Sequence, residues 1–179
     1  MKNKKTKQII LDKSWELFSK NSFFSISMQE IANYIDIRKS LIYYYFESKT
    51  KLYHDVIKNY FENLYKEFEI IYRKDLNPLE KIDLIAELYS KEIEREGMIS
   101  FINTNDQKMD KEIIKIINNA QKNILKYFEK IISDGIKEGD FRNINPKNSS
   151  MAIVGYIEKN KQHNNKLEKN WFDFLLKKE

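Results

Sequence analysis

Apolar residues recur at helical spacing along nearly the whole chain, with polar residues between them. In the N-terminal third, this pattern predicts a first helix that ends at Asn21-Ser22. Ser27 stands three residues before Glu30, the spacing of a capping box, and predicts a short second helix. A third short helix is expected over about 38–46, and Ser48 is placed to cap a long fourth helix. The predicted inward faces of these four helices carry Ile10, Leu17 and Phe18; Met28, Ile31, Ala32 and Ile35; Ile42 and Phe46; and Leu52, Val56, Phe61, Leu64, Phe68 and Ile71.

The same helical pattern continues to the end of the chain. Asn77-Pro78 and Asn145-Pro146 each place an N-capping residue before a proline, which predicts helix starts at both positions. The fifth helix is expected to end at Gly97, and a short segment at 98–102 and a polar loop at 103–109 follow it. A long helix is then expected over about 110–137, with Gly135 and Gly139 at its end. The last expected elements are a helix over 151–157 and beyond, a polar loop at 160–165 and a helix over about 167–177. We therefore predict an all-α fold.

The composition supports this prediction and excludes several kinds of site. The 179 residues include only four Gly and two Pro, which argues against turn-rich β architectures and against a Gly-rich phosphate loop. The chain has no Cys, so it forms no disulfide and offers no thiolate ligand or cysteine nucleophile. His54 and His163 lie far apart in the sequence, and no carboxylates group with them. We expect no metal and no cofactor.

The positive charge lies at one end of the chain. Residues 1–52 carry ten basic and five acidic side chains, which accounts for the whole net charge of +5, while the rest of the chain carries 22 of each. A basic excess confined to one end favours a polyanionic partner, either nucleic acid or an anionic membrane surface. A lysine-rich end that only improves solubility is the alternative.

The segment 27–51 combines several features of a DNA-binding motif. Two short helices joined by a turn of three or four residues form a helix-turn-helix, whose second helix enters the major groove. Basic and small polar residues open that helix, tyrosine hydroxyls follow, and lysines stand at the start of the next helix, where phosphate is favoured. The predicted DNA-contacting residues are Ser27, Met28, Gln29, Arg38, Lys39, Ser40, Leu41, Tyr43, Tyr44 and Lys49.

Each of these features also has an ordinary explanation. Tyrosines at helical spacing are more often core than contact residues, a serine cap occurs in many helices, and lysines promote solubility. Their order within 25 residues favours DNA binding over these separate explanations.

Residues 27–52 resemble the N-terminal DNA-binding domain of the TetR family of transcriptional regulators. The resemblance rests on Trp15-Glu16-Leu17-Phe18, on Ser27-Met28-x-Glu30-Ile31-Ala32 and on Leu41-Ile42-Tyr43-Tyr44-Tyr45-Phe46-x-Ser48-Lys49-x-x-Leu52. It implies a DNA-binding domain over 1–48 and an effector-binding and dimerisation domain over 49–179. The chain departs from the family at four positions: Asp36 replaces a Gly in the turn, Arg38 a Ser or Thr cap, Ser40 a common Gly, and Tyr45 the usual His.

The resemblance also implies a ligand-responsive regulator, most often a repressor, that binds palindromic double-stranded DNA as a homodimer. Its half-sites would lie one or more turns of DNA apart, roughly 34–36 Å. By analogy, the dimer interface would include Gly155, Tyr156, Trp171, Phe172 and Leu175, together with Phe174 and Leu176. The candidates for binding an unidentified small-molecule effector are Phe61, Tyr65, Phe68, Tyr89, Phe101, Tyr127 and Phe128, most of which also suit an ordinary core.

The alternatives to a DNA-binding regulator are an enzyme, a membrane-surface protein and a protein-interaction module. An enzyme is disfavoured because no acid/base pair or nucleophile constellation emerges. A membrane-surface protein is suggested by Lys2–Lys7 followed by Ile9, Ile10 and Leu11, which would form a basic amphipathic helix, but it leaves the ordered motif at 27–51 unexplained. A protein-interaction module whose DNA reading has degenerated is suggested by Asp36, Arg38 and Tyr45. The N-terminus lacks the apolar stretch of a signal peptide, so we expect a cytoplasmic protein without a membrane partner.

Overall fold

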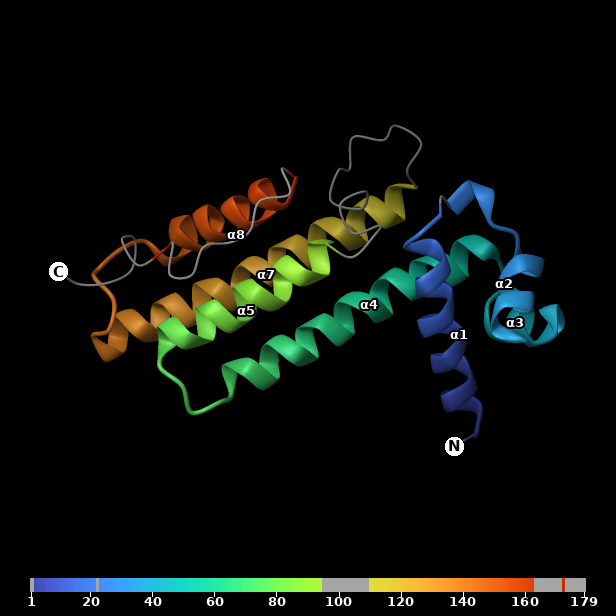
Figure 1. Cartoon of the computed structure of the whole chain (residues 1–179), viewed down its shortest axis with the longest axis horizontal. Coiled ribbons are helices and arrows are strands. Elements are labelled where there is room, and N and C mark those ends of the chain that lie inside the picture. The colour runs from blue at the N-terminus through green and yellow to red at the C-terminus, as the bar shows by residue number, and fades with distance from the viewer. Residues whose placement is uncertain (1, 22, 95–109, 163–171, 173–179) are drawn as a thin grey trace. The chain divides into compact units, whose positions relative to one another are not determined.

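The computed structural model describes residues 2–21, 23–94, 110–162 and 172, and all regular elements within them are helical (Figure 1). The elements are α1 (Lys2–Phe18), the 3-10 helix η1 (Phe23–Ser25), α2 (Met28–Ile35), α3 (Lys39–Tyr45), α4 (Lys49–Tyr72), α5 (Pro78–Glu94), α7 (Lys111–Glu138) and α8 (Pro146–Gln162). The predicted all-α fold is confirmed. None of the described helices is both long and apolar enough to cross a membrane.

The chain divides into two compact units. The N-terminal unit comprises residues 1–64 and 96–117, and the C-terminal unit comprises residues 65–95 and 118–179. Two long helices, α4 and α7, contribute residues to both units.

The N-terminal unit has its own hydrophobic core. Within it, α1 packs on α2, and α2 packs on α3. Most of the inward-facing residues predicted for its helices are buried, whereas Leu17 and Ile35 are only half-buried. The buried side chains include Ile10, Leu11, Phe18, Ile31, Ala32, Ile42, Phe46, Leu52 and Val56. This core positions α3 relative to α2.

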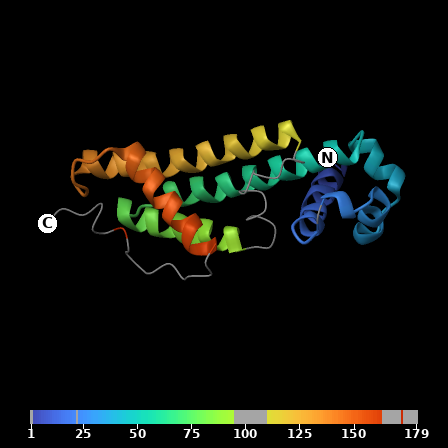
Figure 2. The ribbon, with the colours of Figure 1, turned by 90° about the horizontal axis from the view of Figure 1, so that it is seen from above.

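In the C-terminal unit, α8 crosses α5 and packs against it (Figure 2). The predicted stripes of α5 and α7 are buried, and Ile71 near the end of α4 is half-buried. The side chains that fill this core include Phe68, Ile82, Ile85, Tyr89, Ile124, Phe128, Ile131, Ile153 and Ile157.

The predicted start signals act as helix caps. The Asn77 side chain accepts a 2.9 Å hydrogen bond from the Glu80 backbone N–H, and the Asn77 N–H donates to the Glu80 carboxylate at 3.0 Å. Asn145 accepts a 2.9 Å bond from the Asn148 N–H at the start of α8. Both pairs satisfy backbone donors that lack an intrahelical partner.

The end of α7 uses the two predicted glycines in different ways. Gly139 adopts a positive φ of 86°, a left-handed conformation that glycine adopts without a steric penalty. Gly135 leaves room for the buried ring of Phe141, because a Cβ at this position would overlap that ring. The chain can therefore turn back tightly after the helix, as its glycines predict.

One predicted boundary is wrong. A loop was expected to start at residue 160, but α8 runs without interruption from Pro146 to Gln162. Polar residues without a Gly or Pro between them are compatible with the exposed side of a helix, so polarity alone did not locate its end. Gly97, the segments 98–102 and 103–109 and the helix expected over 167–177 lie outside the described residues, apart from Phe172.

Candidate nucleic-acid interface

A reciprocal capping box begins α2. The Ser27 Oγ accepts a 3.2 Å bond from the Glu30 N–H, and the Ser27 N–H donates to the Glu30 carboxylate at 2.7 Å. The bond from the Ser27 backbone holds the pKa of the Glu30 carboxyl below its usual value. The predicted cap is confirmed, and it fixes the point at which the chain enters the helix-turn-helix.

The turn between α2 and α3 depends on Asp36. This residue has φ 60° and ψ 49°, a left-handed conformation that favours glycine, and its N–H bonds to the carbonyls of Ala32 and Asn33. The Ile37 N–H also donates to the Ala32 carbonyl, at 3.0 Å, which closes the end of α2. Asp therefore occupies the position where the TetR family usually has Gly, since Asp tolerates this backbone better than most residues do.

Two buried residues hold α3 on the core and leave its other face exposed. Ile42 and Phe46 are buried, at 0% and 1% exposure, whereas Tyr43 and Tyr44 are 46% and 69% exposed. Arg38 occupies the N-cap position without a side-chain capping bond, as its replacement of Ser or Thr predicts. The Lys39 Nζ lies 5.8 Å from the centre of the Tyr43 ring, one turn further along.

The predicted contact residues therefore fall into distinct environments. Those whose side chains are exposed are Ser27, Gln29, Arg38, Lys39, Ser40, Tyr43 and Tyr44, and Leu41 is half-buried. Met28 is a correction: its side chain is 5% exposed and belongs to the core, because it lies on the inner face of α2 with Ile31 and Ala32. Its side chain is not available to DNA.

Lys49 has a partner within the protein. Its ammonium donates a 2.6 Å hydrogen bond to the Ile26 carbonyl oxygen and lies 4.3 Å from the centre of the Phe23 ring. Ser48 caps the same helix start by accepting a 3.0 Å bond from the Lys51 N–H, as predicted. The first residue of α4 is thus bonded to the segment that precedes α2.

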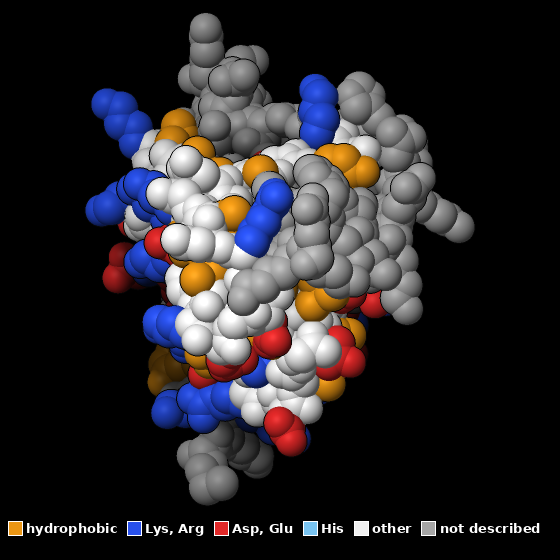
Figure 3. Space-filling view, turned by 90° about the vertical axis from the view of Figure 1, so that its left-hand side faces the viewer, with side chains coloured by type: hydrophobic (Ala, Val, Ile, Leu, Met, Phe, Trp, Pro, Cys, Tyr) orange, Lys and Arg blue, Asp and Glu red, His pale blue; other side chains and the backbone are white. Residues whose placement is uncertain are grey.

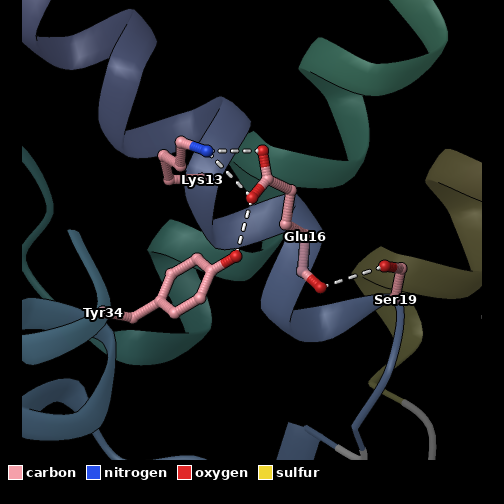
Figure 4. Close-up of polar contacts among 4 residues, drawn as sticks. All are labelled: Lys13, Glu16, Ser19 and Tyr34. Atoms are coloured by element: carbon pink, nitrogen blue, oxygen red, sulfur yellow. Dashed lines mark hydrogen bonds and ion pairs between the residues drawn. The ribbon is translucent and has the colours of Figure 1, made fainter.

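A polar cluster joins α1 to α2 (Figure 4). The Glu16 carboxylate accepts a 2.8 Å bond from Lys13 and a 2.7 Å bond from the Tyr34 hydroxyl, 18 residues along the chain. The bond from Lys13, and then that from Tyr34, lower the pKa of Glu16 below its usual value. The cluster fixes the position of α2 on α1 from the exposed side. The spacing of these residues gave no indication of it.

The N-terminal helix does not present the apolar face that the membrane-surface alternative requires. Ile10 and Leu11 are 0% and 7% exposed and belong to the core, whereas Ile9 is exposed. Figure 3 views the molecule from the left-hand side of Figure 1, where α7 ends and α8 begins, and the hydrophobic side chains on that face form small areas among basic, acidic and other side chains.

In the C-terminal unit, four of the predicted effector-binding residues form one aromatic cluster. Tyr65 and Tyr127 stack with their ring centres 6.3 Å apart, and the Phe68 ring lies 5.4 Å from Tyr127 and 6.5 Å from Tyr89. Burial raises the pKa of Tyr65 to about 12. Of the other candidates, Phe128 is fully buried in the same unit, Phe61 belongs to the N-terminal unit, and Phe101 lies outside the described residues.

The carboxylate beside this cluster, that of Glu158, is not among the residues predicted from the sequence. The Glu158 Oε1 accepts a 2.6 Å bond from the Tyr89 hydroxyl, and burial raises the pKa of Glu158 above its usual value. A signal was present: Glu158 follows the buried Val154 by four residues, so both lie on the inward side of α8.

The predicted dimer residues also differ in their surroundings. Gly155 is exposed, and a Cβ built there would contact nothing within 4 Å; Tyr156 is 37% exposed and Met151 is 54% exposed. Phe172 is 1% exposed within the single chain, so its side chain is already buried without a partner subunit. Trp171 and Leu175 lie outside the described residues.

Two family models match this chain. Residues 10–56 match the model described as bacterial regulatory proteins of the tetR family, and residues 75–161 match the tetracyclin repressor-like C-terminal domain. No curated protein matches the sequence.

Solved structures share the fold at low sequence identity. A putative transcriptional regulator of the TetR/AcrR family is 19% identical, with a TM-score of 0.79 over 90% of this chain and 91% of that chain. FadR from Bacillus subtilis, in complex with stearoyl-CoA, is 19% identical, with a TM-score of 0.70 over 87% and 85%. AibR, in complex with isovaleryl coenzyme A and operator DNA, is 19% identical, with a TM-score of 0.63 over 92% and 88%.

The matched segments contain the helix-turn-helix, with its capped α2, its Asp36 turn and its exposed α3, and most of the C-terminal helices. The chain belongs to the TetR family of transcriptional regulators.

Proposed function

We propose that this protein is a ligand-responsive repressor that binds palindromic operator DNA as a homodimer. The observation that carries the DNA-binding part is the exposed face of α3, where Arg38, Lys39, Ser40, Tyr43 and Tyr44 project from a helix held on the core by Ile42 and Phe46. A helix of this kind fits the major groove, which is about 12 Å wide.

The exposed residues divide into two expected roles. Arg38, Lys39 and Ser40 stand at the start of α3, where side chains of a recognition helix meet base edges, so we assign base reading to them. Ser27 and Gln29 at the start of α2, and the hydroxyls of Tyr43 and Tyr44, are assigned to phosphate contacts. Leu41, half-buried on α3, is assigned a minor apolar contact.

The proposed domains are 1–48 for DNA binding and 49–179 for effector binding and dimerisation. The effector site is proposed at the cluster of Tyr65, Phe68, Tyr89 and Tyr127, where large apolar surfaces adjoin the Glu158 carboxylate. Because FadR and AibR were each solved with an acyl-CoA, acyl-CoA thioesters are the first ligands to test.

The proposed dimer interface includes the exposed side of α8. Met151 and Gly155 are four residues apart and so share one helix face, Tyr156 lies next to Gly155 in the chain and is also exposed, and Gly155 would allow a second helix to approach closely. Sedimentation of the full-length protein tests this, and a monomer at micromolar concentration would contradict it.

DNA binding is tested with duplexes selected from a random pool by the wild-type protein. We expect selected sequences to be palindromic and to bind at least 10³-fold more tightly than scrambled duplexes, with a steep dependence on salt. Affinity that is indifferent to sequence would contradict the proposal. Acyl-CoAs of different chain length are then added, and release of the selected duplex would support effector control.

A further inference from the structure

We propose that Lys49 contributes to operator binding mainly as a positioning residue, by fixing the segment 23–27 that precedes α2, rather than as a phosphate contact. The inference rests on the DNA-binding function proposed above. A lysine in the first turn of a helix next to a helix-turn-helix is otherwise expected to contact phosphate.

The first observation is the hydrogen bond of the Lys49 ammonium. It spans 23 residues of sequence and ends on the Ile26 carbonyl at 2.6 Å, a short distance for an N–H···O bond. Because the donor is charged, such a bond is stronger than one between neutral groups. Ile26 itself is buried, at 6% exposure, so the carbonyl belongs to a fixed part of the chain.

The second observation is the aromatic surface beside the ammonium. Lys49 Nζ lies 4.3 Å from the centre of the Phe23 ring, within the range of a cation–π interaction. That ring also packs 4.7 Å from Tyr53 on α4. The ammonium contacts both the carbonyl and the ring, and a contact with phosphate would compete with these two interactions.

The third observation is what the anchored segment leads to. Ile26 immediately precedes Ser27, the N-cap of α2, whose side chain and backbone form the capping box with Glu30. Fixing the Ile26 carbonyl therefore fixes the start of α2, and the Asp36 turn connects that helix to α3. Through these contacts, Lys49 helps to fix the position of α3, the helix proposed to enter the major groove.

The test compares Lys49→Met with Lys51→Met. Both substitutions keep an unbranched side chain and remove one positive charge from the first turn of α4. The Lys51 ammonium pairs with Asp55 at 2.8 Å and not with the segment before α2, so it controls for charge alone. Affinity for a selected duplex is measured by fluorescence anisotropy across a range of salt concentrations.

A positioning role predicts that Lys49→Met weakens binding at least tenfold more than Lys51→Met does, with the same slope of log K against log[salt]. A direct phosphate contact predicts instead that the slope of Lys49→Met falls by about 0.9 relative to Lys51→Met. That result, or an affinity equal to that of Lys51→Met, would overturn the inference.

Hydrogen–deuterium exchange of the DNA-free proteins separates this inference from the proposed function. Lys49→Met should accelerate exchange of the amides at 26–31, whereas Lys51→Met should leave them unchanged. If neither protein bound DNA, the exchange comparison would still support or overturn the anchoring role. Unchanged exchange in Lys49→Met would overturn it whatever the outcome with DNA. Lys49→Arg, which keeps the charge and a donor of similar reach, should restore slow exchange.

Discussion

The Tyr89 hydroxyl donates a 2.6 Å hydrogen bond to the Glu158 carboxylate and so joins α5 to α8 across 69 residues of sequence. Tyr89 is 1% exposed and Glu158 is partly buried, so the bond satisfies a carboxylate that has lost much of its contact with water. The pair therefore stabilises the packing of α8 on α5, and it also places a polar group beside the proposed effector site.

Removing the Tyr89 hydroxyl should destabilise the fold. Tyr89→Phe leaves the Glu158 carboxylate without this donor, and we expect the free energy of unfolding at pH 7 to fall by about 1–3 kcal/mol. Urea denaturation measures the change. The control is the same substitution in a Glu158→Gln background, where the loss should be smaller; equal losses in both backgrounds would show that the two residues are not coupled.

The pKa of Glu158 adds a pH dependence to this pair. Burial raises its folded-state pKa above the ordinary value of 4.5, so its contribution to stability is fully present below pH 4.5 and declines as pH rises through the folded-state pKa. We expect Glu158→Gln to remove this decline, measured as the difference in unfolding free energy between the two proteins from pH 4 to pH 8. A difference that did not vary with pH would contradict it.

Backbone strain at Asp36 should be relieved by glycine. Asp36→Gly is expected to raise the free energy of unfolding by roughly 0.5–1 kcal/mol, because glycine adopts φ 60° without a Cβ clash. Asp36→Ala should lower it, and Asp36→Asn, which removes the charge but keeps a side chain that tolerates this conformation, should stay close to wild type. If Asn were as stabilising as Gly, charge rather than strain would be the cause.

Local sequence signals predicted most of the fold. Ser27 with Glu30, Asn77-Pro78 and Asn145-Pro146 each marked a helix start, because a cap depends on residues only three positions apart. The predicted reading face on α3 is exposed for a similar reason: the helical period that buries Ile42 and Phe46 directs Tyr43 and Tyr44 outward. The helical period by itself therefore assigns most residues of a helix to its buried or its exposed face.

The contacts that complete the sites could not be predicted in this way. Lys49 with Ile26, and Tyr89 with Glu158, join residues 23 and 69 positions apart, and a helical period does not determine which faces meet. Met28 is a different case, because it was predicted both as an inward-facing residue of α2 and as a DNA contact. Its burial agrees with the helical period and contradicts the predicted contact.

The polar cluster in Figure 4 should stabilise the protein only above acidic pH. The hydrogen bonds from Lys13 and Tyr34 lower the folded-state pKa of Glu16 below 4.5, so its contribution is present above pH 4.5 and is lost as pH falls through the folded-state pKa. We expect Glu16→Gln to lower the thermal midpoint at pH 7, with the difference shrinking as pH falls below 4.5 and through the folded-state pKa. A constant difference over that range would point to packing rather than charge.

Base reading by Lys39 gives the most direct test of how α3 recognises DNA. Its side chain is exposed in the first turn of α3, and the Tyr43 ring beside it limits the directions in which the ammonium extends. We expect Lys39→Ala to weaken binding to the selected duplex by about 1–3 kcal/mol and to relax the preference at one base pair, because a side chain that contacts a base edge discriminates by this amount. Binding to scrambled DNA should change far less. Lys20→Ala, which removes an exposed positive charge after the end of α1, should leave the base preference unaltered. Equal losses of Lys39→Ala on selected and scrambled duplexes would mean that Lys39 contacts phosphate, and base reading would then fall to Arg38 and Ser40.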